Sequence, residues 1–249
     1  MRRGATLFAA VLAVGGAAAV VAPATAARTA TVADTPLGSA AWRDCTTTLG
    51  GVGVTVARTR RTQTIVNGTG GSRATVSFFV RTDTACGFRR VLRTPGRVGY
   101  GGIADGATRR QGTGTTPAGM YTMTEAFGLK APPATAMPYR RVLPGDWWVQ
   151  DNGSAFYNTY RPQSLGGFAI TTAGANGSEL LARFGRQYAH SIVIDFNRPP
   201  DVQRPYRGAG IFLHAGGTGA TAGCVSIPEK GIRTVLSYLT PGDRITIVP

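Results

Sequence analysis

Metal ligands are scarce in this sequence. Its 249 residues include only two histidines and three cysteines, and no cluster of carboxylates lies near them. Structural and catalytic zinc sites need three or four His, Cys or carboxylate ligands, so we predict no metal site. Nothing in the sequence indicates a cofactor.

Features typical of nucleic-acid binding are also lacking. Lysine and arginine together number 27 against 12 acidic residues, but lysine is scarce and the arginines are scattered. No nucleic-acid-binding motif is present, so we predict no nucleic-acid partner. A basic chain is attracted to acidic polymers and peptide carboxylates, although a high-GC composition that favours arginine explains the same charge equally well.

The only long apolar run lies at the N-terminus. Arg2 and Arg3 precede an apolar run at 5–21 that is short for a membrane span, and Ala24-Thr25-Ala26 gives the small-x-small pattern that a signal peptidase reads. An export signal fits this layout better than an uncleaved anchor or a buried helix, and its cleavage leaves no membrane span. We predict a signal peptide at 1–27, a flexible leader at 28–40 and one domain at 41–249 whose N-terminal part is rich in β-strands.

The three cysteines divide into a pair and a single residue. An exported chain can pair an even number of cysteines, so one of the three has no partner. Cys45 and Cys86 both lie beside expected strand ends, whereas Cys224 stands alone in a glycine-rich segment. We therefore predict a Cys45–Cys86 disulfide and a free Cys224.

Long helical periodicity is almost absent, and short β segments separated by Gly, Asn and Pro fill the chain. This spacing predicts a mostly β fold, a mostly antiparallel sandwich or barrel, with one or two short helices. The expected strands are 64–66, 74–81, 88–93, 119–124, 147–150, 190–196, 210–214 and 244–248. The expected helices are 178–184 and 228–239, the second with Pro228 in its first turn and apolar residues at helical spacing.

The segment from residue 211 to residue 226 carries the chemistry. An apolar strand is expected to end at His214, and a loop of small residues leads back to Cys224, close to the start of a helix. A thiolate is a strong nucleophile, an imidazole is its natural base, and a helix N-terminus favours the thiolate. From spacing alone, a structural role is as good an explanation as catalysis: Cys224 would be a small buried thiol, and hydrogen bonds to the main chain would satisfy His214. His190 is expected at a strand edge.

This segment resembles the active-site motif of the L,D-transpeptidase (YkuD-type) catalytic domain, in which a histidine and a glycine-rich loop precede Ser/Thr-His-Gly-Cys. The matching residues are His214, Thr221, Gly223 and Cys224. Ala222 replaces the second histidine of the motif, and the loop from the histidine to the cysteine is shorter than the commonest form. In these two respects the sequence resembles a secreted, actinobacterial-like subgroup of the family. Residues 97–102 and 114–119 are similar to two upstream elements of the family, so the resemblance covers 97–249.

The resemblance implies a β-sandwich with the cysteine and the histidine at one end of a cleft. Cys224 would be the acylated nucleophile and His214 its base, with the main-chain carbonyl of Ala215 or Gly216 orienting the ring. The oxyanion donors would be main-chain N–H groups of the loop residues Thr221, Ala222 and Gly223.

Four further residues are candidates for substrate binding: Tyr206, Arg207, Ser226 and Trp148. Tyr206 and Arg207 precede the His214 strand and would meet a substrate carboxylate, unless they form a solvated turn. Ser226 stands where many members of the family carry Asn or Arg. Trp148 lies in a segment that resembles part of the cleft in relatives, although core packing also explains a tryptophan there.

The resemblance implies a secreted cell-wall enzyme that joins peptidoglycan stem peptides by acyl transfer through a cysteine thioester. Two alternatives remain open. A carboxypeptidase or amidase on the same scaffold would pass the acyl group to water. A non-catalytic protein would bind the cell wall with an unreactive Cys224.

Overall fold

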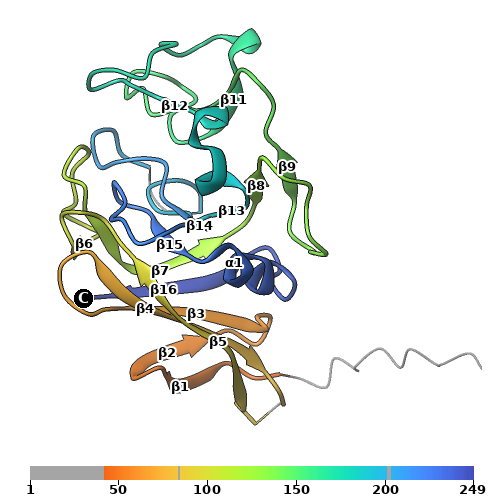
Figure 1. Ribbon diagram of the computed structural model, residues 1–249. Helices are drawn as coiled ribbons and strands as arrows, with labels where there is room; N and C mark the ends of the chain where they lie inside the picture. Colours follow the sequence, from red (N-terminus) through yellow and green to blue (C-terminus); the bar gives the residue numbers. More distant parts are fainter. Residues whose placement is uncertain (1–41, 84, 201–202) are drawn as a thin grey trace, which may run out of the picture. The chain divides into compact units, whose positions relative to one another are not determined.

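A curled mixed sheet forms most of this computed structural model, which describes residues 42–83, 85–200 and 203–249 (Figure 1). Within those residues the sheet has eleven strands, which follow one another in space as β6 (Ile103–Asp105), β7 (Thr116–Met123), β16 (Asp243–Val248), β3 (Thr62–Gly68), β4 (Arg73–Arg81), β5 (Phe88–Arg97), β15 (Val225–Ile227), β14 (Phe212–Ala215), β13 (Ser191–Val193), β8 (Ala126–Gly128) and β9 (Tyr139–Arg141). Antiparallel and parallel pairs are mixed, and β14 with β15 and β16 with β3 are parallel. The predicted signal peptide at 1–27 and leader at 28–40 lie outside the described residues.

Smaller elements complete the described part of the chain. β1 (Cys45–Leu49) and β2 (Val52–Val56) form a hairpin, and β11 (Tyr160–Pro162), β10 (Asp146–Trp148) and β12 (Glu179–Leu180) form a separate sheet. The helical elements are the 3-10 helices η1 (Gln163–Leu165) and η2 (Leu181–Tyr188) and the α-helix α1 (Glu229–Leu236). Apart from η1, which is a single turn, the described residues contain two short helical elements, η2 and α1. The predicted mostly β fold with one or two short helices is therefore confirmed.

The central strands are buried on both faces, which explains their apolar sequences. Along β4, Val76 and Phe78 point into the main core, while Phe79 faces the β1–β2 hairpin. Side chains alternate between the two faces of a strand, so a strand covered on both sides is apolar nearly throughout. The hairpin turns at Gly50-Gly51, whose φ angles of 58° and 85° are those a tight two-residue turn requires.

The helix α1 agrees with the helix predicted at 228–239. Pro228 is its N-cap residue, and Ile232, Val235 and Leu236 are fully buried in the main core. The apolar spacing of the sequence therefore gives the buried face of this helix. No helix in the described part of the chain is long and apolar enough to cross a membrane.

The helix predicted at 178–184 is confirmed only in part, as the 3-10 helix η2 from residue 181 onward. Glu179 and Leu180 pair with β10 as strand β12, and the 3-10 helix η2 follows them. Gly185 interrupts η2 with a φ of 50°, a conformation that glycine adopts more readily than other residues. The apolar residues at helical spacing thus belong partly to a strand and partly to a kinked 3-10 segment.

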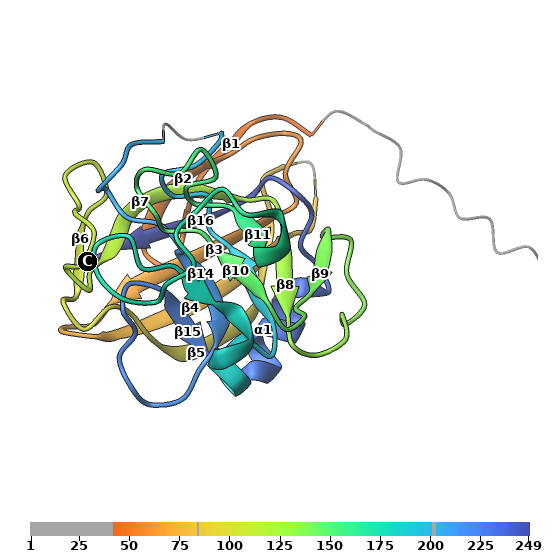
Figure 2. The same ribbon diagram turned by 90° about the horizontal axis from the view of Figure 1, so that it is seen from above.

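An aromatic cluster joins β10 and η2 to strand β14, which lies beside β15 (Figure 2). The rings of Trp148 and Tyr188 pack edge-on against Phe212, with centroids 4.8 and 5.6 Å from it. Cys224 belongs to the same buried cluster. The aromatic packing therefore sets the position of the segment that carries the thiol.

Candidate active site

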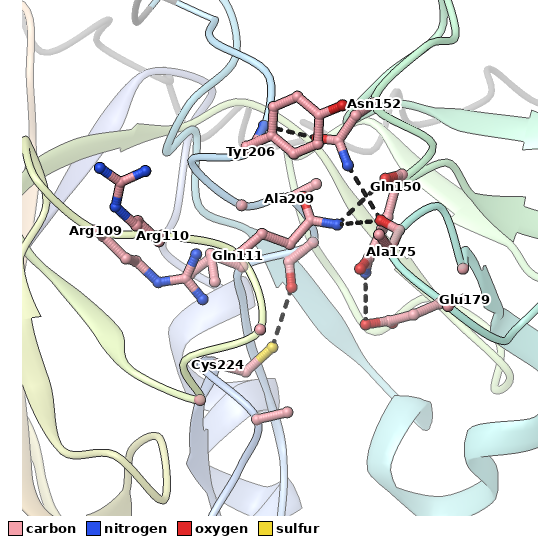
Figure 3. A pocket seen from close by; sticks show the side chains of 18 of the residues that line it. Arg109, Arg110, Gln111, Gln150, Asn152, Ala175, Glu179, Tyr206, Ala209 and Cys224 are labelled. Carbon is pink, nitrogen blue, oxygen red and sulfur yellow. Dashed lines mark hydrogen bonds between the residues drawn. The ribbon is translucent and has the colours of Figure 1, made fainter.

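Cys224 lies in the wall of a cavity of about 510 Å³ (Figure 3). The polar side chains that line the cavity include Arg109, Gln111, Gln150 and Glu179. Figure 3 shows Arg109 on one side of the thiol and Glu179 on the other. At the cavity and elsewhere in the described residues, no group of three or more His, Cys, Asp or Glu side chains is arranged so that it could hold a metal ion. The cavity therefore places a guanidinium on one side of a nucleophilic atom and a carboxyl group on the other.

Threonine hydroxyls hold the loop before Cys224 in place. Thr116 Oγ1 donates to Gly223 O at 2.7 Å, and Thr221 Oγ1 donates to Cys224 O at 2.6 Å. The Thr221 N–H donates to Val98 O at 3.0 Å and ties the loop to the chain after β5. The residues that precede the nucleophile are therefore fixed from two sides.

The Cys224 thiol is buried and protonated at neutral pH. Its Sγ donates to Gly210 O at 3.3 Å and accepts from Phe212 N–H at 3.4 Å. Burial is the main cause that raises the pKa of the thiol, and Glu179 raises it further. The hydrogen bond from Phe212 and the charge of Arg109 lower the pKa but do not outweigh burial. Formation of the reactive thiolate therefore needs a base.

His214 lies on β14 with its ring held by the main chain. The ring is buried, and its Nδ1 lies 2.7 Å from Ala215 O, a carbonyl that can only accept the Nδ1 proton. Burial lowers the pKa of His214, although main-chain hydrogen bonds at Ala215 and Gln187 raise it. The ring is therefore neutral at pH 7. Of the two carbonyls expected to orient it, the structure brings that of Ala215 to the ring.

The sheet register relates the thiol to the imidazole. Leu213 on β14 lies opposite Val225 on β15, so Phe212 lies beside Cys224 and His214 follows two residues along the same face. Among the described residues, however, the thiol and the imidazole share no hydrogen bond. The structure thus brings the two elements together with the thiol bonded to main-chain groups.

The strand β15 separates Cys224 from α1, which corrects the expectation of a helix N-terminus beside the thiol. Val225 to Ile227 extend the sheet between β5 and β14, and α1 begins only at Glu229. The field of a helix end falls off within about one turn. Burial therefore dominates the pKa of the thiol.

Fewer main-chain donors are available near the thiol than the sequence suggests. The Thr221 N–H donates to Val98 O, and the Gly223 N–H donates to the Thr221 hydroxyl at 3.2 Å. Within the described chain, the N–H groups of Ala222 and Cys224 have no such acceptor. These two N–H groups are the ones left to bind an oxyanion.

Of the four predicted substrate-binding residues, one lines the cavity and three do not. Tyr206 lines the cavity and is 63% exposed. Arg207 directs its Nε to Gly106 O at 2.9 Å. Ser226 and Trp148 are buried, the first within the sheet and the second in the aromatic cluster. These three are not among the described residues that line the cavity.

Arg109 and Glu179 are candidates that the sequence did not reveal. The Glu179 carboxyl accepts from Gln150 Nε2 at 2.9 Å and from the Tyr188 hydroxyl at 2.5 Å, and burial raises its pKa to about 7. A lone acidic residue in an expected amphipathic helix gives no sign of this environment. Arg109 could have been suspected from the sequence, although only weakly. It is the first of two adjacent arginines that lie just before the glycine-containing element at 114–119.

The other two cysteines form the predicted disulfide. Cys45 lies on β1 and Cys86 before β5, and their α-carbons are 5.6 Å apart, a usual separation for bridged cysteines. Cys224 is left as a free cysteine. Disulfides are typical of chains outside the cytoplasm.

Comparison with known proteins gives one family match. The family model of the YkuD L,D-transpeptidase catalytic domain matches residues 75–247, so the match begins at β4 rather than at residue 97 as expected. A search of curated proteins found no match.

Two solved structures are similar to parts of the chain. One is L,D-transpeptidase 1 of Mycobacterium tuberculosis, with 12% identity, a TM-score of 0.34 and coverage of 76% of this chain and 62% of that chain. The other is an L,D-transpeptidase from Mycobacterium smegmatis, with 13% identity, a TM-score of 0.36 and coverage of 81% and 65%. The chain thus spans less than two thirds of either solved protein. On the family match, which extends over more than half of its residues, the chain belongs to the YkuD family of L,D-transpeptidase catalytic domains.

Proposed function

We propose that the chain is a secreted, cysteine-dependent L,D-transpeptidase that cross-links peptidoglycan stem peptides in the cell wall. It would belong to a subgroup whose motif has Ala222 in place of the second histidine. The observation that carries the proposal is the free Cys224 in the wall of the cavity, in a chain of this family. The disulfide supports a location outside the cytoplasm.

The first half of the reaction forms a thioester on Cys224. The thiol turns from Gly210 O toward His214, whose ring takes the proton while Ala215 O holds Nδ1–H. The thiolate attacks the carbonyl of the third residue of a stem peptide, and the N–H groups of Ala222 and Cys224 stabilise the oxyanion. The C–N bond breaks, and the terminal D-amino acid leaves with the proton from His214.

The second half of the reaction releases the acyl group. An amine of a neighbouring stem peptide attacks the thioester, the C–S bond breaks, and the proton of the amine passes to the imidazole and then to the thiolate. Attack by water at the same carbon gives the carboxypeptidase or amidase outcome. The fraction of cross-linked product therefore measures which acceptor the cavity favours.

The buried thiol also supports a second candidate, a non-catalytic cell-wall-binding protein. Cys224 is only 8% exposed, its pKa is raised, and it shares no hydrogen bond with His214 among the described residues. Such a protein would bind muropeptides without forming a covalent adduct. Reactivity of the thiol therefore separates the two functions.

The test is intact-mass measurement after incubation with a carbapenem and, separately, with purified muropeptides. We expect a covalent adduct and release of the terminal D-amino acid with the wild-type protein, and neither with Cys224→Ala. The two histidines give a matched pair, because both are buried. His214→Ala should slow acylation by roughly 10²–10⁴-fold through loss of the base, whereas His190→Ala should leave it within a few-fold.

Each result decides between the candidates. An adduct on Cys224 with cross-linked product supports the transpeptidase, and an adduct with only hydrolysed product supports the carboxypeptidase or amidase. Muropeptide binding with no adduct at any pH supports the wall-binding protein and excludes the proposed enzyme.

A further inference from the structure

A buried arginine with one unused donor lies at the cavity. Arg109, in the loop between β6 and β7, is 7% exposed and lines the cavity together with Cys224. Its Nε donates to Thr115 O at 2.7 Å and its Nη1 to Arg207 O at 2.9 Å. Nη2 has no hydrogen-bond partner among the described residues. The guanidinium is thus held rigidly while one of its nitrogens stays available.

Two glycines make room for this guanidinium. A Cβ on Gly223 would lie 2.9 Å from Arg109 Nη2, and a Cβ on Gly208 would collide with Nη1. Both glycines have positive φ angles, of 143° and 112°, which other residues rarely adopt. Nη2 therefore lies against the residue that immediately precedes the nucleophile. Figure 3 shows the Arg109 side chain extending toward Cys224, whereas that of Arg110 extends away from it.

The charge of Arg109 has no anionic partner within the described residues. No ion pair includes this arginine, and its ring contact is with Phe196, 5.5 Å from the centroid. Burial lowers the pKa of Arg109, but a guanidinium remains charged at neutral pH. A buried cation with a free donor favours an anion at that place, and a carboxylate matches the geometry of an arginine best.

We propose that Arg109 Nη2 binds the terminal carboxylate of the amino acid that leaves when Cys224 is acylated. This inference rests on the proposed function. Because Nη2 lies beside Gly223, the carboxylate bound there belongs to a group close to the carbonyl that Cys224 attacks, and one extended residue spans about 3.3–3.6 Å. On the opposite side of the thiol lies the carboxyl group of Glu179, which repels a carboxylate when it is ionised and carries no positive charge to attract one. The donor must therefore end one residue after the bond that breaks.

The experiment compares two donor tetrapeptides that differ only at the C-terminus, one ending in D-alanine and one in D-alaninamide. Release of D-alanine or D-alaninamide gives kcat/KM for acylation. We expect the wild-type protein to favour the free acid by about 100-fold, as a charge-assisted hydrogen bond in a buried site allows. Arg109→Gln should lose this factor on the acid and stay within a few-fold on the amide.

The control variants separate recognition from folding. Arg110→Gln alters the neighbouring exposed arginine of the same cavity and should keep the preference within about three-fold. Arg109→Lys keeps the charge and should recover part of the preference for the acid. Thermal unfolding and iodoacetamide labelling of Cys224 report whether each variant is folded.

Several outcomes would overturn the inference. If the wild-type kcat/KM is about equal for the acid and the amide donor, the inference is contradicted whatever the variants do. It is also contradicted if Arg109→Gln lowers kcat/KM equally for both donors, because that result indicates a purely structural role. D-alanine release without preference for the acid overturns only the role of Arg109. Absence of any release from either donor overturns the proposed function as well.

Discussion

Glu179 is a carboxyl group in a place where ionisation is costly. It lies in the cavity wall with both oxygens bonded, to Gln150 and to Tyr188, and burial raises its pKa from 4.5 to about 7. The folded protein therefore holds this proton to a higher pH than the unfolded chain does. The protonated Glu179 carboxyl therefore stabilises the folded protein. This stabilisation is fully present below about pH 4.5, where the carboxyl is protonated in both states, and it is lost as the pH rises through about 7.

We predict that Glu179→Gln raises the melting temperature relative to the wild type above pH 7, by about 2–4 °C for each kcal/mol gained, and changes it little at pH 4. Thermal unfolding between pH 4 and pH 8 measures the difference. Glu229→Gln is the matched control of opposite sign, because the hydrogen bond from Lys130 lowers the pKa of Glu229. A Glu179→Gln difference that does not change with pH would contradict the raised pKa.

Gly223 is the residue where a side chain would do most harm to the site. Its φ is 143°, and an added Cβ would lie 2.9 Å from Arg109 Nη2 and 3.0 Å from Thr115 O. We predict that Gly223→Ala slows Cys224 acylation by roughly 100-fold, since small displacements of reacting groups cost that much. Gly217→Ala in the same loop meets nothing within 4 Å and should keep the wild-type rate. Equal rates for the two variants would show that the loop tolerates the side chain.

At the scale of elements, α1 covers the main core with its apolar face. Leu236 is fully buried there among residues of the sheet, whereas Lys230 on the same helix is exposed. We predict that Leu236→Ala lowers the free energy of unfolding by about 2–5 kcal/mol through the cavity it leaves. Lys230→Ala should change it by less than about 0.5 kcal/mol. Urea unfolding measures both, and a small loss for Leu236→Ala would mean that the helix can close the gap.

The parallel pair β14–β15 is the element that builds the site. The short β15 carries the chain from Cys224 into the sheet beside β14, so the position of the thiol depends on strand pairing and not on a helix end. The loop before Cys224 is bonded to Thr116 at the start of β7, a strand distant in sequence. The Thr116 hydroxyl therefore links β7 directly to the residues around the nucleophile.

At the scale of the whole described chain, the disulfide and the thiol lie in different cores. Cys45 packs with the hairpin and the outer faces of β3 and β4, whereas Cys224 packs in the aromatic cluster. The bridge links residues 41 apart in sequence, which restricts the unfolded chain.

We predict that the double variant Cys45→Ala, Cys86→Ala loses about 2–5 kcal/mol of unfolding free energy while Cys224 keeps its rate of labelling by iodoacetamide. Urea unfolding and thiol labelling on the same sample check both parts. Wild-type protein treated with a reductant should unfold at the same urea concentration as the variant. A changed labelling rate in folded variant protein would show that the two cores are coupled.

The sequence alone determined the features that depend on local pattern. Runs of apolar and β-branched residues marked β3, β4 and β16, helical spacing marked α1, and an odd cysteine count separated Cys224 from the bridged pair. The string around His214 and Cys224 indicated the family through residues adjacent in the chain. Short strands such as β8, β9 and β15 were missed, because three residues are too few to show a period.

Only the tertiary structure decided which polar groups surround the thiol. Arg109 and Glu179 come from a loop and from a short strand far apart in sequence, and strand pairing and aromatic packing bring them to opposite sides of Cys224. The segment at 178–184 has helical spacing, yet Glu179 and Leu180 pair with β10 as a strand, and only the residues from 181 onward are helical. Burial and charge arise from such long-range contacts, so the pKa values of Cys224 and Glu179 had no signal in the sequence.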